Sequence, residues 1–384
     1  MLKIKFENLL VILVLTLIVG YDTLMTTMLN RTIPNIPVIL LICFSLLLCF
    51  RFLYIKKFTF FYILTSILLL ATSSVVFMST GGTNFLLYSL LILLLYDADI
   101  DVILKTYVIV SGAIVLGVFV LSILGVIPNL QFAQVRSSVL VIRNSFGFIY
   151  PTDFASHCFY LFIAWGYILR KRLIILRTLV GLSLSFFIIK FCDARLNALS
   201  VLLATVIFIL MYVTKERKFK IYGILPYSAA IFSSIMFYLT YFFTWSSSLF
   251  VSLNNLFSMR LFLGKNAIDT YDIHLFGTTG VKFIGYGGTT ESVYSYNYVD
   301  SSYIQMLFYY GVVPVVLLVL IYVIASKRFY KQGMFLFLAL LSLITVNCMI
   351  EAFWVRPGYN IFMFALFASL LPNQYKTKDR IELS

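Results

Sequence analysis

The stretch LNALSVLLATVIFILMYVT, residues 196–214, runs for 19 residues without a charged side chain. A helix of this length extends about 28 Å at 1.5 Å per residue, close to the thickness of the hydrocarbon core of a bilayer. Water does not hydrate that core, so the backbone groups of the segment must be paired within the helix. The stretch therefore predicts a helix that crosses a membrane.

Similar apolar stretches recur along the whole chain, which predicts an all-α, polytopic transmembrane bundle of about twelve helices. Most connectors between the stretches are short, and this favours a single membrane domain over residues 1–384. Two connectors are long. The first long connector is residues 127–150, and the second is residues 244–300, which precedes the tenth helix. The predicted spans are residues 8–28, 34–54, 58–79, 83–97, 103–126, 151–169, 173–191, 196–214, 222–243, 301–325, 333–352 and 356–373.

The composition supports a membrane protein and argues against a nucleic-acid-binding protein. The chain is 62% hydrophobic and 11% charged, whereas soluble domains carry about 25% charged residues. The net charge of +14 could suit a nucleic acid, but most Lys and Arg residues lie in short connectors, where they orient membrane proteins. The expected environment is a lipid bilayer, and no nucleic-acid partner is expected.

The distribution of basic residues predicts the orientation of the bundle. If the N-terminus is cytoplasmic, 20 of the 29 Lys and Arg residues fall on the cytoplasmic side and nine on the other side. This bias follows the positive-inside rule. We therefore expect a multi-pass protein of the cytoplasmic membrane with both termini in the cytoplasm and both long connectors outside it.

Arginines on the non-cytoplasmic side run against this bias and need a reason to be there. Arg143 and Arg260 lie in the two long connectors. Arg136, Arg195 and Arg356 also lie on the non-cytoplasmic side. Guanidinium groups bind phosphate oxygens in a bidentate manner, so these arginines favour an anionic ligand. The alternative is that each one reaches the lipid headgroups or pairs with a nearby carboxylate.

Several titratable residues on the same side are candidates for chemistry or for helix capping. Asp300 ends the second long connector, where its carboxylate could accept a proton from a substrate hydroxyl or cap the tenth helix. Asp153 lies at a helix start, and His157 follows four residues later on the same expected helical face. His274 lies in the second long connector. No third ligand is suitably spaced around the two histidines, so a metal site is not expected.

The glycines at 277–288 do not form a phosphate-binding loop, because the Gly-Lys-Ser/Thr ending is missing. The tyrosines at 286, 294, 296, 298 and 303 could stack on sugar rings or belong to an interfacial aromatic belt. Asp193 and Arg195 could form a local ion pair at the start of the eighth helix. The sequence leaves these alternatives open.

The outer segments resemble those of the Wzy-type polysaccharide polymerases and, more distantly, the O-antigen ligases of the same superfamily. The resemblance extends over about residues 136–320. Tyr150 and Thr152 stand where the family usually has His and Asn. The motifs that carry the resemblance are RNSFGFIYP (143–151), DAR (193–195), Arg260 followed by a helix and FIGYG (283–287), and DSSY with a later YG (300–311).

The resemblance implies transfer of glycan between polyprenyl-diphosphate-linked oligosaccharides, which polymerises repeat units into a surface polysaccharide such as a capsule. It implies that Arg143 and Arg260 hold the diphosphate and that Asp300 lies near the acceptor hydroxyl. Other expected substrate-binding residues are Arg136, Arg195, Asp153, His157, His274 and Tyr303. No metal or nucleotide cofactor is expected, and flippase and chain-length regulator proteins are expected partners.

Two other functions remain open from the sequence. A flippase for the same lipid-linked sugars would place ionisable groups within its spans, and Asp22 and Glu351 are the main such residues here. A ligase that transfers finished glycan to another acceptor is not distinguished from a polymerase by these residues.

Overall fold

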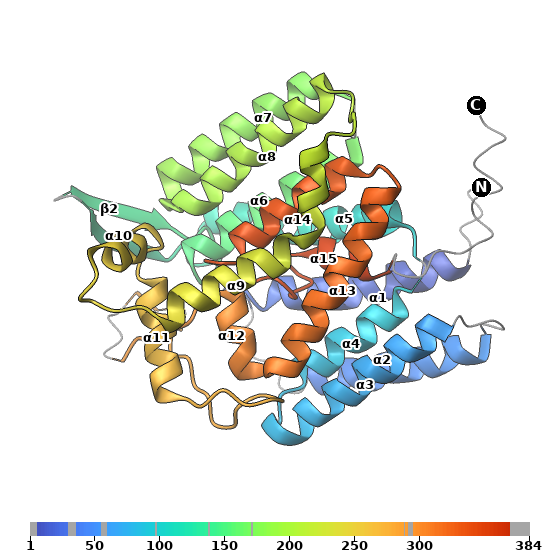
Figure 1. The fold of residues 1–384 in the computed structure, drawn as a ribbon. Helices are drawn as coiled ribbons and strands as arrows, with labels where there is room; N and C mark the ends of the chain where they lie inside the picture. The colour runs from blue at the N-terminus through green and yellow to red at the C-terminus, as the bar shows by residue number, and fades with distance from the viewer. Residues whose placement is uncertain are drawn as a thin grey trace.

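The computed structural model describes residues 6–29, 36–54, 60–96, 98–136, 139–169, 172–287, 289–290 and 295–368. Helices account for most of these residues (Figure 1). In chain order the α-helices are α1 (Phe6–Leu24), α2 (Ile36–Tyr54), α3 (Phe60–Thr80), α4 (Asn84–Leu94), α5 (Ile100–Ile123), α6 (Pro151–Leu169), α7 (Ile174–Phe187), α8 (Arg195–Val213), α9 (Ser228–Tyr241), α10 (Ser248–Leu256), α11 (Arg260–Thr270), α12 (Ser302–Tyr309), α13 (Val312–Lys331), α14 (Phe335–Asn347) and α15 (Ile361–Ala368). A π-helical turn, η1 (Ile188–Cys192), continues α7, and a 3-10 segment, η2 (Lys220–Tyr227), precedes α9.

The described helices identify a multi-pass membrane protein. Six of them are long and apolar enough to cross a bilayer: Tyr62–Thr80, Ile100–Ile123, Ile174–Cys192, Arg195–Val213, Lys220–Tyr241 and Val312–Lys331. Four shorter apolar helices lie among them. Each of the twelve predicted spans contains at least one helix, although the number of helices that cross the membrane stays a prediction.

The outward faces of the helices carry large apolar side chains. Phe60 is 80% exposed, Met78 is 83% exposed and Ile175 is 74% exposed. Many such side chains lie together on α2, α3 and α7, and soluble proteins rarely expose apolar patches of that size. Lipid is the solvent that accommodates these faces.

The centre of the bundle is formed by the last two helices. Nearly every side chain of α14 is buried, and so are the described side chains of α15. Helices that are apolar on all sides belong in a core. Helices α6, α8, α9 and α13 pack against α14, and α4, α5 and α13 pack against α15. In Figure 1 these two helices lie between the α7–α8 pair and the α1–α4 group.

The first long connector is not a loop throughout, because it contains a short β-hairpin that the sequence analysis did not predict. Residues 131–144 form an antiparallel hairpin of β1 (Gln131–Arg136) and β2 (Val139–Asn144). Gln131 lies opposite Asn144, and Phe132 lies opposite Arg143. The β-branched Val135, Val139, Val141 and Ile142 favour strands, and the hairpin is too short to have been distinguished from a loop by its periodicity.

The second long connector contains two helices, α10 and α11, so it is not a single extended loop. Helix α10 ends at Leu256 and α11 begins at Arg260, because Ser258 and Met259 have φ of 50° and 69° and interrupt the helix. The β-hairpin, α10 and α11 lie at the same end of the bundle, as Figure 1 shows. The two long connectors are therefore neighbours in space.

The predicted tenth span over residues 301–325 is two helices. Helix α12 ends at Tyr309, Gly311 has φ of 91°, and α13 begins at Val312. At this break the backbone of the second long connector packs against the chain, since Val312 N–H donates to His274 O at 3.1 Å and Val313 N–H donates to Leu275 O at 3.0 Å. A continuous helix would have no room for these contacts.

Candidate functional site

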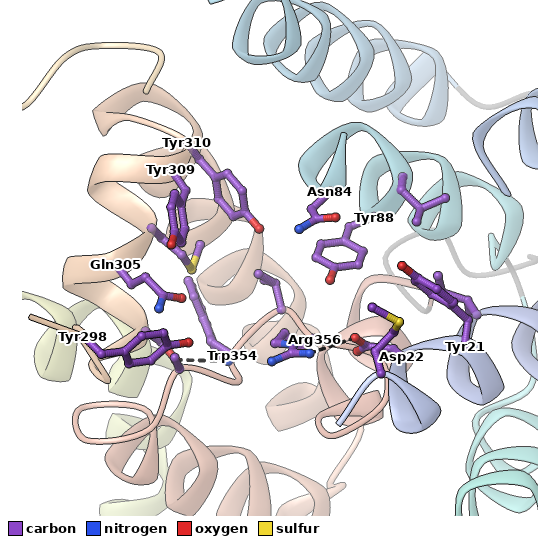
Figure 2. Close-up of a pocket in the computed structure, with 17 residues that line it drawn as sticks. Tyr21, Asp22, Asn84, Tyr88, Tyr298, Gln305, Tyr309, Tyr310, Trp354 and Arg356 are labelled. Atoms are coloured by element: carbon purple, nitrogen blue, oxygen red, sulfur yellow. Dashed lines mark hydrogen bonds and ion pairs between the residues drawn. The ribbon is translucent and has the colours of Figure 1, made fainter. Parts of the chain in front are cut away.

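A cavity of about 290 Å³ lies between α1, α4, α12 and the segment that joins α14 to α15. Figure 2 shows the side chains around it. Its walls are rich in tyrosine and amide side chains and contain one arginine and one aspartate. The polar and aromatic lining residues are Tyr21, Asp22, Asn84, Tyr88, Tyr298, Ser302, Gln305, Tyr309, Tyr310, Trp354 and Arg356, and the apolar ones include Ile18, Met25 and Leu87.

An ion pair joins Arg356 to Asp22 within the cavity wall. Arg356 Nη2 lies 3.0 Å from Asp22 Oδ1, and the N–H of Gly358 donates to Asp22 Oδ2 at 2.9 Å. The side chain of Asp22 is 8% exposed, whereas that of Arg356 is 31% exposed. A guanidinium has five N–H donors. The ion pair therefore fixes Arg356 in place and leaves it accessible to an anion in the cavity.

Trp354 belongs to the cavity lining and packs against α12. Its backbone N–H donates to Ser302 Oγ at 3.1 Å, and its ring packs against Tyr303 and Tyr322. These contacts hold the segment that carries Arg356 against α12.

A second ion pair lies between Arg260 at the start of α11 and Asp300 before α12. Arg260 Nη2 lies 3.1 Å from Asp300 Oδ2, and both side chains are about one-fifth exposed. Arg260 Nη1 also donates to Ser258 O at 3.0 Å. Burial raises the pKa of Asp300, and the guanidinium of Arg260 opposes this shift. The structure thus brings together two of the residues that the sequence analysis singled out.

Glu351, in the segment between α14 and α15, adds a third carboxyl group to this region. It is 5% exposed, and Asn197 Nδ2 donates to its Oε1 at 3.4 Å. Glu351 interacts electrostatically with Arg260 and with the carboxyl groups of Asp300 and Asp153. These carboxyl groups therefore lie within electrostatic range of one another.

Tyr298 connects the two ion pairs. Burial raises the pKa of Tyr298, the guanidinium of Arg356 opposes this shift, and the carboxyl of Asp300 adds to it. Tyr298 also lines the cavity. Tyr298 therefore lies within electrostatic range of both ion pairs, through Arg356 of one and Asp300 of the other. The two ion pairs belong to the same region of the bundle.

Asp153 and His157 share one face of α6, where Tyr359 contacts both. The hydroxyl of Tyr359 donates to Asp153 Oδ1 at 2.9 Å, and its ring stacks on His157 with a centroid distance of 4.0 Å. His157 is fully buried, and its Nε2 lies 2.9 Å from Thr26 Oγ1. Asp153 also accepts from the N–H of Tyr150 at 3.2 Å. This cluster ties α6 to the segment that carries Arg356.

Arg143 and Arg195 do not line the cavity. Arg143 Nε donates to Cys192 O at 3.1 Å, and its Nη1 donates to Gln134 Oε1 at 3.4 Å. Arg195 forms the expected local ion pair with Asp193 at 3.3 Å and is 65% exposed. In the structure Arg260 forms its ion pair with Asp300, and Arg143 bonds to Cys192 and Gln134. A diphosphate site shared by Arg143 and Arg260 stays a prediction.

His274 and Tyr303 also lie outside the cavity lining. Arg136 ends β1, and its side chain is outside the described part of the structure. His274 is exposed in the second long connector. Tyr303 is 2% exposed and donates to Thr345 O at 2.8 Å, so it packs α12 against α14. Among the described residues, no group of three His, Cys, Asp or Glu side chains could hold a metal ion.

The sequence analysis missed Tyr310 as a site residue. It named Tyr298 only among tyrosines that could stack on sugars, Asp22 only as an ionisable residue within a span, and Arg356 only as an arginine on the non-cytoplasmic side. A signal for the ion pair was present. Arg356 is the only basic residue between Lys331 and Lys376, and Asp22 is the only charged residue in the predicted span 8–28. An isolated charge in an apolar environment needs a partner. The sequence did not say that these two charges pair with each other.

Comparisons with protein-family models, with curated proteins and with solved structures find no match to this chain.

Proposed function

We propose that this protein is a membrane glycosyltransferase that polymerises polyprenyl-diphosphate-linked oligosaccharides into a surface polysaccharide at the outer face of the cytoplasmic membrane. The observation that carries the proposal is the cavity lined by tyrosines around the partly exposed Arg356, next to the Arg260–Asp300 pair. It combines a fixed cation, aromatic rings, amide groups and nearby carboxyl groups. The resemblance of the outer motifs to the Wzy-type polymerases supports the same activity.

The cavity suits a substrate that has a charged, a sugar and a lipid part. Arg356 offers N–H donors to diphosphate oxygens, and Asp22 keeps it oriented. Tyrosine rings and the amides of Asn84 and Gln305 suit a sugar. Ile18 and Leu87 provide an apolar wall for the first units of the polyprenyl chain. A site for inorganic anions alone would not need this aromatic and apolar lining.

In the proposed reaction, the oxygen of an acceptor hydroxyl attacks the anomeric carbon of the donor sugar. A glycosidic C–O bond forms, and the bond between the anomeric carbon and the diphosphate oxygen breaks. The electron pair leaves with the polyprenyl diphosphate, whose charge Arg356 stabilises. The hydroxyl proton passes to the Asp300 carboxylate, and its raised pKa makes it a better proton acceptor. Arg260 orients Asp300.

The decisive experiment for this function is deletion of the gene, followed by sizing of the surface polysaccharide and extraction of lipid-linked saccharides. We expect the deletion strain to lose long polymer and to accumulate single lipid-linked repeat units. The wild-type gene on a plasmid should restore the polymer. Polysaccharide of unchanged length in the deletion strain would refute the proposal.

A flippase for the same lipid-linked saccharides is the second candidate. It is favoured by the break between α12 and α13 at Gly311, which adjoins the cavity-lining Tyr309 and Tyr310, because transporters often build their sites from discontinuous helices. The side of the membrane on which repeat units accumulate discriminates between the two functions. Units that face outward in the deletion strain support a polymerase, and units that remain on the cytoplasmic face support a flippase.

A further inference from the structure

Four aromatic rings gather beside the cavity, although they come from three separate segments. Phe132 belongs to β1, Tyr150 precedes α6, and Tyr286 and Tyr296 lie between α11 and α12. The ring centroids of Phe132 and Tyr286 are 5.9 Å apart, those of Phe132 and Tyr150 are 6.0 Å apart, and those of Tyr286 and Tyr296 are 5.3 Å apart. Tyr286 is 38% exposed. The two long connectors thus join through an aromatic cluster that remains open to solvent.

The cluster is held in a defined position and is continuous with the cavity wall. The N–H of Gly287 donates to the Tyr150 hydroxyl oxygen at 2.7 Å. A Cβ atom added at Gly285 would lie 3.0 Å from that oxygen and 3.5 Å from the ring of Tyr298. The ring centroids of Tyr150 and Tyr286 are 6.4 Å apart, so Phe132, Tyr150 and Tyr286 form a compact triangle. Since Tyr298 lines the cavity, this cluster adjoins the cavity wall. We call the cluster and its neighbour Tyr298, that is Phe132, Tyr150, Tyr286, Tyr296 and Tyr298, the aromatic track.

Polar groups accompany the rings at the outer end of the track. Arg143 lies directly opposite Phe132 in the hairpin register, so the two side chains share one face of the hairpin. Gln131 and Asn144 lie on the other face. Sugar C–H groups pack on the negative faces of aromatic rings, and sugar hydroxyls bond to tyrosine hydroxyls and to guanidinium N–H groups. A lipid tail would favour a wall without these polar groups, so the track fits a saccharide.

We propose that the aromatic track binds the saccharide chain of the substrate whose diphosphate occupies the Arg356 cavity. This inference rests on the proposed function and adds to it the binding site of the glycan. The track holds the growing chain near the reaction centre between additions, so it determines the length of the polymer.

The test is complementation of the deletion strain with Tyr286→Ala, Tyr286→Phe and Trp245→Ala, followed by sizing of the polysaccharide. Tyr286→Ala removes the most exposed ring of the track, and it should shorten the modal chain length by about threefold or more, because one aromatic contact is lost. Tyr286→Phe keeps the ring and should restore long chains. Trp245→Ala removes a ring that is 54% exposed and lies outside the track, and it should leave chain length unchanged.

A second measurement separates binding from folding. The probe is the oligosaccharide released by mild acid from the lipid-linked units of the deletion strain, and its binding to purified protein in nanodiscs is measured by calorimetry. Tyr286→Ala should weaken binding about 3- to 10-fold, and Tyr286→Phe should not. If deletion yields single units but Tyr286→Ala still gives chains of wild-type length and wild-type binding, saccharide binding by the aromatic track is refuted, and the proposed polymerase function is retained. A deletion strain with unaltered polysaccharide overturns both proposals.

Discussion

Replacing Arg356 with alanine is expected to reduce polymer formation by about 10²–10³-fold, the usual effect of removing one preorganised donor to a departing oxyanion. The substitution also leaves Asp22 without its partner in a site where the aspartate is only 8% exposed. An unpaired buried charge destabilises the fold by about 3–5 kcal/mol. The effect on activity must therefore be separated from the effect on folding.

Two further variants make that separation. Arg356→Ala combined with Asp22→Asn removes both charges, so it should recover thermal stability without recovering polymer. Arg356→Lys keeps the charge but loses the planar guanidinium, and it should retain only part of the activity. Lys282→Ala removes an exposed basic residue of the second long connector and should behave as the wild type. Long polymer made by a well-folded Arg356→Ala protein would exclude Arg356 from the reaction centre.

Gly311→Ala is expected to prevent the protein from folding to its normal yield. A Cβ atom at Gly311 would lie 2.3 Å from Gly277 N and 2.4 Å from Leu275 O, and Gly311 has φ of 91°. Both contacts are with backbone atoms, which cannot move aside as a flexible side chain could. Overpacking and an unfavourable φ together cost about 2–6 kcal/mol, which is a large part of the stability of a typical domain. The measurement is the yield of monodisperse protein after detergent extraction.

Gly117→Ala is the matched control for this substitution. Gly117 lies within α5 and has no atom within 4 Å of the position of its added Cβ. Alanine has the higher helix propensity, so this variant should be extracted with at least the wild-type yield. Normal yield and melting temperature for Gly311→Ala would show that the break between α12 and α13 is not held by the contact with Leu275 and Gly277.

The helices themselves could be predicted from the sequence, but their breaks could not. The stretch at 196–214 matches α8 within one residue at each end, since an uninterrupted apolar run specifies a helix locally. The span predicted over 301–325 is broken at Gly311 because the backbone of Leu275 packs there. A glycine that is required by a contact with a distant segment looks the same in the sequence as any other glycine in a helix.

The candidate site was predicted only in part for the same reason. Arg260 and Asp300 were both singled out, and the structure joins them at 3.1 Å. Arg143 was expected to hold the diphosphate together with Arg260; its guanidinium donates to the carbonyl of Cys192, and the shared diphosphate site stays a prediction. Both arginines lie in long connectors, and the folding of those connectors into a β-hairpin and two short helices decides where each side chain lies.

The sequence by itself determined that this is a helical membrane protein, because the free energy of burying a long apolar segment in lipid depends on that segment alone. It also determined that charges such as Asp22 and Arg356 needed partners. Only the tertiary structure decided that these two residues, 334 positions apart, pair with each other at 3.0 Å and open onto one cavity. An ion pair depends on the distance between two side chains, and the packing of α1 against the segment after α14 fixes that distance.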